Sequence, residues 1–434
     1  MKRIALLVLL SCAASAHAAD LLEVYRDALA NDAQYASAKA LLEANKEKGP
    51  QATAGILPTV NLTGSSTYTR TDASLPTERS FNFNTNTYQV QLTQPLFRWQ
   101  NWVAYKQGEL QVGVAEATFQ AARNDVALRA AQAYFDVLYA DEVLSSVQAL
   151  KSAAGEQLQL AKKSFQVGTV TITDVNEAQS KFDLASAQEI AAQSDLVVKR
   201  QALQLLLGKE PTALSRLRPG VNITAPIPAG IEEWATAAEK NNPTVQAQQL
   251  TVEIAKRDVE KARAGHLPTV DLVATASNTH AGNGSSGTPS LSRSNAIGVQ
   301  FTVPIYAGGA TQSKVREALA LYDKSQSDLE AQKRTATQAA RQAFVGVTSG
   351  LALVRGYDAA VLSSKSAVDS NKLGYEVGVR INIDVLNAQS TLADTQQKLA
   401  KARYDTLIAQ LKLKAASGTV ESTDIEQINA LLGN

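Results

Sequence analysis

The chain repeats one pattern twice, and this duplication constrains its fold more than any other feature. Ile56–Val60 reads ILPTV, and His266–Val270 reads HLPTV 210 residues later. Phe165–Gly168 (FQVG) recurs as Tyr375–Gly378 (YEVG) at the same spacing. A repeat of about 210 residues is too long for a solenoid unit, so the sequence indicates two versions of one larger unit.

Each repeat contains two segments in which apolar and polar residues alternate, which predicts a β-hairpin in each half. We expect four strands of about ten residues each, the length that a tilted membrane strand needs. Polar linkers at Thr71–Ser80 and Asn278–Ser294 join them in pairs. Two hairpins of a soluble sheet would show the same alternation. The apolar positions of the four strands are Val60, Leu62 and Tyr68; Tyr88, Val90 and Leu92; Val270, Leu272, Ala274 and Ala276; and Ile297, Val299, Phe301 and Val303.

A long stretch without proline follows each hairpin, at Leu96–Glu210 and at Ile305–Asn434. Because proline breaks helix interiors, both stretches permit very long helices. Phe97–Phe165 alone is about 69 residues, roughly 100 Å as one helix. Apolar residues spaced by three and four predict coiled-coil seams. These residues are Leu128, Ala131, Phe135 and Leu138 in the first half, and Phe344, Val347, Leu351 and Val354 in the second.

One turn interrupts each helical stretch. Val167–Thr173 and Val377–Ile383 combine a glycine with β-branched residues, which are poor helix formers. Each is expected to be the turn of a helical hairpin, with Asp174 or Asp384 near the start of the returning helix. Four prolines mark an irregular joint between the repeats: Pro211, Pro219, Pro226 and Pro228.

The first residues predict a secretory leader. Lys2 and Arg3 precede the apolar run Ile4–Leu10, and Ala16–Ala18 forms an A-x-A cleavage site. Lipidation at Cys12 is an alternative to cleavage after Ala18. With cleavage after Ala18 the mature chain has no cysteine, which excludes disulfides and thiol catalysis. After the leader no run of 18 apolar residues appears, so we expect no membrane-spanning helix.

Neither nucleic-acid binding nor catalysis is predicted. The 42 basic and 41 acidic residues form no broad basic field. Gly282–Gly287 spells G-x-G-x-x-G, but Pro289 and a strand follow where a dinucleotide site needs a helix. His266 and His280 lack the clustered spacing of a zinc site. We therefore expect no enzyme activity, no cofactor and no metal.

Four strands cannot close a barrel alone, and an open sheet edge is not tolerated in lipid. If the strands span a membrane, several chains must share one barrel, and three chains would give 12 strands. Aromatic residues cluster at both strand-to-helix junctions, where an interfacial girdle belongs, although ordinary packing would also explain each of them. These residues are Phe97, Trp99, Trp102 and Tyr306.

At these landmarks the sequence resembles the TolC family of outer-membrane efflux proteins. The resemblance rests on Gln94–Phe97, Gly265–Thr269, Pro304–Gly309, Gly374–Leu386 and Leu399–Gly418. It implies an α+β membrane protein in the cell outer membrane: a homotrimer whose 12-stranded β-barrel, four strands per chain, contacts outer-membrane lipid. The barrel would continue as an α-helical coiled-coil barrel in the periplasm. A periplasmic adaptor and an inner-membrane ABC or proton-driven pump would be the partners.

The repeats and the resemblance together predict a succession of segments along the chain. These are the signal peptide (1–18), a helical segment (19–58), β-hairpin 1 (59–97), long helices with a helical hairpin (98–208), a linker (209–230), a second helical segment (231–268), β-hairpin 2 (269–305), a second set of long helices with a hairpin (306–416) and a C-terminal equatorial segment (417–434).

The resemblance also assigns a gate to the tips of the helical hairpins. A tyrosine and an arginine, here Tyr375 and Arg380, would hold the entrance shut, with Thr173 and Asp174 as partners. Arginine can donate two hydrogen bonds to a carboxylate and tyrosine one, so the chemistry fits a latch. Ordinary surface ion pairing at a helix turn is the alternative for Arg380.

The family places two aspartates per chain in rings at the entrance. Asp384 matches the first, but Asn387 occupies the second position, so we expect one ring and weaker cation binding. The adaptor would dock on the turns. The matching turn residues are Val167, Gly168, Val377 and Gly378.

The sequence thus predicts an outer-membrane channel-tunnel, with protein export by a type I system as the favoured function. A multidrug efflux duct beside a proton-driven pump is the alternative. A soluble periplasmic coiled-coil scaffold would explain the helices but not the two paired hairpins.

Overall fold

The computed structural model describes residues 18–74, 78–211, 213–282 and 288–433. The expected leader through residue 17, with Cys12, lies outside the described residues, as does 283–287 of the G-x-G-x-x-G segment. The elements are α1 (Leu21–Asn31), α2 (Ala33–Lys46), α3 (Lys48–Ala54), β1 (Thr59–Ala73), β2 (Arg79–Phe97), α4 (Trp99–Gln166), α5 (Ile172–Leu207), β3 (Arg216–Leu217), α6 (Ile231–Asn241), α7 (Pro243–Arg263), the 3₁₀ turn η1 (Ala264–His266), β4 (Thr269–Ala281), β5 (Ser290–Thr302), α8 (Ala310–Glu376), α9 (Asn382–Ala416), α10 (Ser422–Asn429) and β6 (Leu432–Gly433).

The chain forms two compact units, and each combines parts of both repeats. The helical unit contains the described residues of Met1–Ala38, Gln120–Asn242 and Lys333–Asn434. The sheet unit contains the described residues of Lys39–Phe119 and Pro243–Gln332. The duplication therefore does not divide the protein into two folding halves, because each unit needs elements from both copies.

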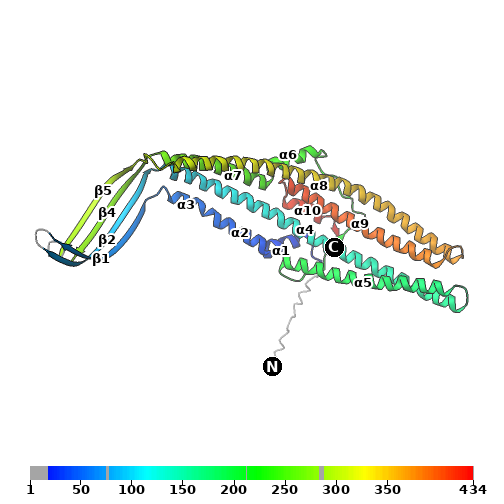
Figure 1. Ribbon diagram of the computed structural model, residues 1–434. Helices are drawn as coiled ribbons and strands as arrows, with labels where there is room; N and C mark the ends of the chain where they lie inside the picture. Colours follow the sequence, from blue (N-terminus) through cyan, green and yellow to red (C-terminus); the bar gives the residue numbers. More distant parts are fainter. Residues whose placement is uncertain (1–17, 75–77, 212, 283–287, 434) are drawn as a thin grey trace, which may run out of the picture. The chain divides into compact units, whose positions relative to one another are not determined.

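In the sheet unit, the four long strands form one antiparallel layer in the order β1-β2-β4-β5 (Figure 1). Strand β2 pairs with β4, so the hairpins of the two repeats lie side by side. In this register Val90 faces Leu62 on one side and Ala276 on the other, while Ala274 faces Ile297. The alternation found in the sequence is therefore the alternation of the two faces of one sheet.

The two faces of this sheet differ sharply in polarity. One carries most of the large apolar side chains, and many of them are exposed. We call this the apolar face; it holds Val60 and Leu62 of β1, Val90 and Leu92 of β2, Val270, Leu272, Ala274 and Ala276 of β4, and Ile297, Val299 and Phe301 of β5. The opposite face carries mainly Thr, Ser, Asn and Gln. A single layer with one apolar and one polar face suits a wall between lipid and water.

The strands are longer than expected: β1 has 15 residues, β2 has 19, and β4 and β5 have 13 each. The predicted linkers Thr71–Ser80 and Asn278–Ser294 are therefore partly strand, with Asn278 paired to Arg293. The sequence pattern fades there because both faces become polar. The ladder continues because its hydrogen bonds are made by the backbone.

A register shift at the end of β2 changes which way Phe97 faces. Pro95 lies opposite Asp271 on the polar face, but Phe97 lies opposite Val270 on the apolar face. The extra residue of such a bulge is what turns the following side chain over. Because Val270 also pairs with Phe301, two aromatic side chains flank this end of the apolar face.

In the helical unit, the core forms where the helices meet the N-terminal and C-terminal segments. Phe135 of α4 stacks on Tyr404 of α9, with ring centroids 5.4 Å apart. Tyr134 is fully buried and donates a hydrogen bond of 2.7 Å to the Ser215 carbonyl oxygen. The predicted seams are packing surfaces: Ala131, Phe135, Leu138, Val347 and Val354 are buried, and Leu128, Phe344 and Leu351 pack against the cores.

Helix α8 contains one 18-residue stretch with mean hydropathy 1.2, which by length and composition alone is apolar and long enough to cross a membrane. The stretch is not an unbroken apolar run, so it does not by itself contradict the expectation that no helix spans the membrane. Apolar residues at seam spacing raise the mean hydropathy of a packing helix in the same way.

Candidate functional site

The candidate site is built on the turns of two helical hairpins in the helical unit, α4–α5 and α8–α9 (Figure 1). Each turn is made by a glycine with left-handed backbone, Gly168 with φ 77° and Gly378 with φ 80°. The amide of Thr169 donates to the Ser164 carbonyl oxygen at 2.9 Å, and Val379 donates to Gly374 at 2.9 Å. These bonds satisfy carbonyl groups that the helix end leaves free, so both turns use the same αL helix stop.

The two returning helices begin differently. At α5, the Asp174 amide donates to Thr171 Oγ1 at 3.3 Å, and the Thr171 amide donates to Asp174 Oδ2 at 2.8 Å. This capping box also includes the Thr171 hydroxyl, which donates to Asp174 Oδ2 at 2.7 Å. These donors favour the carboxylate form of Asp174 and so lower its pKa. The hydroxyl of Thr171 contributes most to this shift, and the Thr171 amide contributes next.

At α9 the equivalent cap position is Ile381, whose side chain offers no acceptor. Its first-turn amides therefore lack the side-chain partner that α5 has. One position before, Arg380 takes the place of Val170. Its Nη1 lies 3.6 Å from Asp384 Oδ2, one turn into α9. The second turn thus has an ion pair between Arg380 and Asp384 in place of the capping box of Thr171 and Asp174.

Gly374 positions the Arg380 side chain. A Cβ atom at this glycine would lie only 2.7 Å from Arg380 Cγ. The stem of Arg380 therefore folds back over the end of α8, which only a glycine at this point allows. The Arg380 side chain remains 59% exposed and the Asp384 side chain 34% exposed.

The predicted latch residues lie on these turns. Within this chain Arg380 contacts Asp384, and Asp174 is bonded to Thr171 in the capping box, so the latch between neighbouring coiled coils stays a prediction. Thr173 is exposed and Tyr375 half-buried, and no hydrogen bond joins either to the other latch residues in the described part of this chain. The predicted docking residues Val167 and Val377 are 75% and 65% exposed.

The structure also brings the two hairpins together just behind their turns. Val175 and Ala178 of α5 form one apolar cluster with Leu158 of α4 and Leu386 of α9. Asn382, the first residue of α9, is buried and donates from Nδ2 to the Gln157 carbonyl oxygen at 3.4 Å. This junction was not predicted from the sequence, where its one signal is Asn382, the only amide side chain in the second turn segment.

Among the entrance residues, Asp384 is half-buried and Asn387 is exposed, and both lie in the first two turns of α9. The expected entrance ring of one carboxylate and one amide per chain stays a prediction. Among the described residues, no group of three or more His, Cys, Asp or Glu side chains is placed to hold a metal ion.

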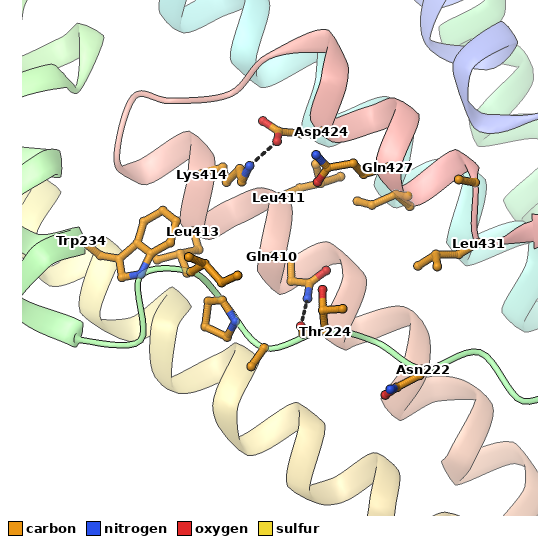
Figure 2. A pocket seen from close by; sticks show the side chains of 15 residues that line it. Asn222, Thr224, Trp234, Gln410, Leu411, Leu413, Lys414, Asp424, Gln427 and Leu431 are labelled. Carbon is orange, nitrogen blue, oxygen red and sulfur yellow. Dashed lines mark hydrogen bonds and ion pairs between the residues drawn. The ribbon is translucent and has the colours of Figure 1, made fainter.

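A cavity of about 470 Å³ lies elsewhere in the helical unit, between α9, α10 and the segment before α6 (Figure 2). Several of its polar groups are bonded to one another or to neighbouring backbone. Gln410 donates to the Thr224 carbonyl oxygen at 2.7 Å, and Lys414 pairs with Asp424. The Trp234 indole N–H is held by the Pro228 carbonyl oxygen at 2.8 Å. We assign no ligand to this cavity.

Comparison with known proteins identifies the class. The model of the outer membrane efflux protein family matches twice, over residues 24–209 and 234–419, which is the duplication seen in the sequence. The chain is 32% identical to the outer membrane protein TolC of Escherichia coli over 96% of its length and 85% of the relative. It is 29% identical to the alkaline protease secretion protein AprF of Pseudomonas aeruginosa, over 96% of this chain and 88% of the relative.

The fold matches as well. The outer membrane protein VceC of Vibrio cholerae superposes with a TM-score of 0.79 at 21% identity, covering 92% of this chain and 96% of that one. This chain belongs to the outer membrane efflux protein family. The expected family, fold class and outer-membrane location, with the helices in the periplasm, are thereby confirmed. The family is one of channel proteins rather than enzymes.

Proposed function

We propose that three copies of this chain form an outer-membrane channel-tunnel that exports cargo from the cell. The observation that carries the proposal is the four-stranded sheet with one apolar and one polar face. Among the described residues, β1 and β5 each pair along one edge only, so the sheet presents two open edges. Lipid does not tolerate open edges, and copies that share a barrel remove them. Three copies give 12 strands, within the range of membrane barrels.

The periplasmic entrance would be opened at the hairpin turns. Exposed apolar side chains cover both turns, including Val167 on the first and Val377, Val379 and Ile381 on the second. Such groups suit contact with the helical tip of a periplasmic adaptor, itself carried by an inner-membrane pump. Arg380, exposed beside an uncapped helix start, is available to bond a carboxylate or hydroxyl of a neighbouring chain, with Tyr375 as second donor.

Protein export by a type I system is the favoured cargo class. The similarity to AprF, which is described as an alkaline protease secretion protein, extends over nearly the whole of both chains. An efflux duct for small molecules beside a proton-driven pump is the second candidate, favoured by the efflux description of the family. A strain lacking the protein separates them, because loss of an exported protein and increased drug sensitivity are independent readouts.

The channel and its latch are tested together by planar-bilayer conductance of the purified protein. The wild type should give a small steady conductance, and Tyr375→Phe combined with Arg380→Ser should raise it, because the donors that hold the entrance are removed. Arg355→Ser, on an exposed part of the same helix α8, serves as the matched control. An unchanged conductance in the double variant would reject the latch. No channel activity from correctly folded oligomers would reject the duct in favour of a periplasmic scaffold.

A further inference from the structure

The apolar face of the sheet ends in a cluster of hydrogen-bond donors towards the hairpin loops. Four residues on this face form the cluster, which we call the donor cluster: Tyr88, Asn278, His280 and Arg293. Asn278 pairs with Tyr88 on one side and with Arg293 on the other. His280 lies two residues after Asn278 on the same face. It is a diagonal neighbour of Tyr88 on one side and of Arg293 on the other, each about 7–8 Å away.

The donor cluster lies at one end of the band of apolar residues on the apolar face. Asn278, which lies beside Tyr88, is eight positions along β4 from Val270, which lies beside Phe97 and Phe301. At about 3.4 Å per residue this is about 27 Å of strand, close to the height of the apolar band of a membrane barrel once the strand is tilted. Aromatic side chains therefore bound the band at both ends, as membrane interfaces favour.

The charge of this border is positive. Arg293 is exposed and has no ion-pair partner among the described residues. Within the described strands, the only carboxylate on this face is Asp72, whose Oδ2 lies 3.4 Å from Arg70 Nε. Asp271, the other strand carboxylate, faces the polar side and is taken up by Arg98. In the described strands, therefore, no carboxylate on this face is left to offset Arg293.

We propose that the donor cluster binds the phosphate group of a membrane lipid. Phenol, amide, imidazole and guanidinium groups can all donate hydrogen bonds, and guanidinium matches the geometry of a phosphate bidentately. The apolar rows directly below would hold the acyl chains of the same molecule. A protein partner is disfavoured because those rows, with Leu92 and Ile297, face lipid. The inference rests on the proposed function only in requiring that this face meets lipid.

The test uses the full-length protein in lipid nanodiscs. The discs contain phosphatidylcholine with a minor share of either phosphatidic acid or diacylglycerol, which share acyl chains and differ by the phosphate. Lipid that remains with the protein after extraction in mild detergent is quantified by mass spectrometry. The wild type should retain phosphatidic acid in preference to diacylglycerol. Arg293→Gln should reduce this preference about 10-fold, the value of one charge-assisted hydrogen bond.

Two further variants separate charge from geometry. Arg293→Lys should recover only part of the preference, because an ammonium group lacks the planar fork. Arg316→Gln, an exposed arginine of α8 in the same unit, should leave it unchanged. Equal retention by wild type and Arg293→Gln would overturn the proposal. So would binding of inorganic phosphate to protein in pure phosphatidylcholine discs as tight as that of the lipid, which would identify a free anion site.

Conductance measured on the same preparations keeps the two proposals apart. Loss of lipid preference in Arg293→Gln with wild-type conductance supports the lipid site and leaves the channel intact. A wild type that conducts but shows no preference rejects the lipid site alone. A wild type that retains phosphatidic acid without conducting rejects the channel alone.

Discussion

Arg98 and Asp271 are joined by two parallel hydrogen bonds, Nε to Oδ1 at 2.7 Å and Nη2 to Oδ2 at 2.6 Å. Arg98 is the residue between β2 and α4, and Asp271 lies in β4 with its side chain 8% exposed. The pair therefore ties the start of the first long helix to the hairpin of the other repeat. It has no counterpart in the second repeat, where Ala307 follows the matching Tyr306.

Breaking this pair should destabilise the sheet unit. Arg98→Gln leaves the Asp271 carboxylate buried without its cation, at a cost of about 1–3 kcal/mol. We expect the heat-resistant oligomer to dissociate at a lower temperature on unheated-against-heated gels. The double variant Arg98→Gln, Asp271→Asn should recover part of the loss, because it removes the uncompensated charge. Additive losses in the double variant would show that the two residues act independently.

Removing the cap of α5 should loosen the first hairpin turn. Thr171→Ala deletes the side-chain acceptor for the Asp174 amide and should cost about 1 kcal/mol locally. Hydrogen exchange of the first turn of α5 should become faster. Thr173→Ala, exposed and outside the box, is the matched control. Equal exchange in both variants would argue against the capping role.

The same box should respond to acid in a fixed direction. Because the pKa of Asp174 is lowered on folding, its stabilisation is complete above the ordinary value of 3.8 and is lost as the pH falls through the lower folded-state pKa. Exchange in this turn should therefore rise below about pH 4 in the wild type. In Thr171→Ala that acid dependence should be weaker.

Gly374→Ala should disturb the entrance without removing any polar group. The added methyl group would meet Arg380 Cγ and push the side chain off the end of α8. If Arg380 holds the entrance, resting conductance should rise, though less than in the Tyr375/Arg380 double variant. Gly356→Ala is the matched control, because its Cβ would meet nothing within 4 Å. A wild-type conductance in Gly374→Ala would mean that the position of Arg380 is not critical.

Cation binding at the entrance should depend on Asp384. Asp384→Ala removes the single carboxylate of the expected ring and should reduce block by divalent cations. Asn387→Asp adds a second carboxylate per chain and should strengthen that block about 10-fold or more, because adjacent rings bind one cation together. The dose dependence of current block by Mg²⁺ measures both. Ion selectivity that is the same in Asp384→Ala and wild type would exclude the ring.

Long-period features of the chain were predictable from sequence. The duplication, the alternating strands and the proline-free stretches each involve tens of residues, so single exceptions do not obscure them. The capping box could also have been predicted, because Thr171 and Asp174 have the spacing of that motif. The family resemblance points to Asp174 as a partner of Arg380 as well, because the family pattern concerns pairs between hairpins rather than bonds within one turn.

Other features could not be read from the chain because they depend on register. Arg98 and Asp271 are 173 residues apart and meet only because β2 pairs with β4 at one of several registers. The Phe97 bulge likewise shows no sequence signal beyond a proline two residues earlier. Asn382 and Gln157 meet only once two long helical hairpins have chosen a common seam.

The unequal capping of the two turns has a consequence for how such an entrance can work. In the proposed trimer, six hairpins would alternate around the tunnel, three starting with a Thr171 box and three with an uncapped Ile381. In such a ring, the three capped tips would keep their positions while the three uncapped tips move. The wall of the tunnel would then stay intact as the entrance opens. Gene duplication would thus have provided more than length. It would have allowed the α4–α5 hairpin to become the static part of the entrance and the α8–α9 hairpin the moving part.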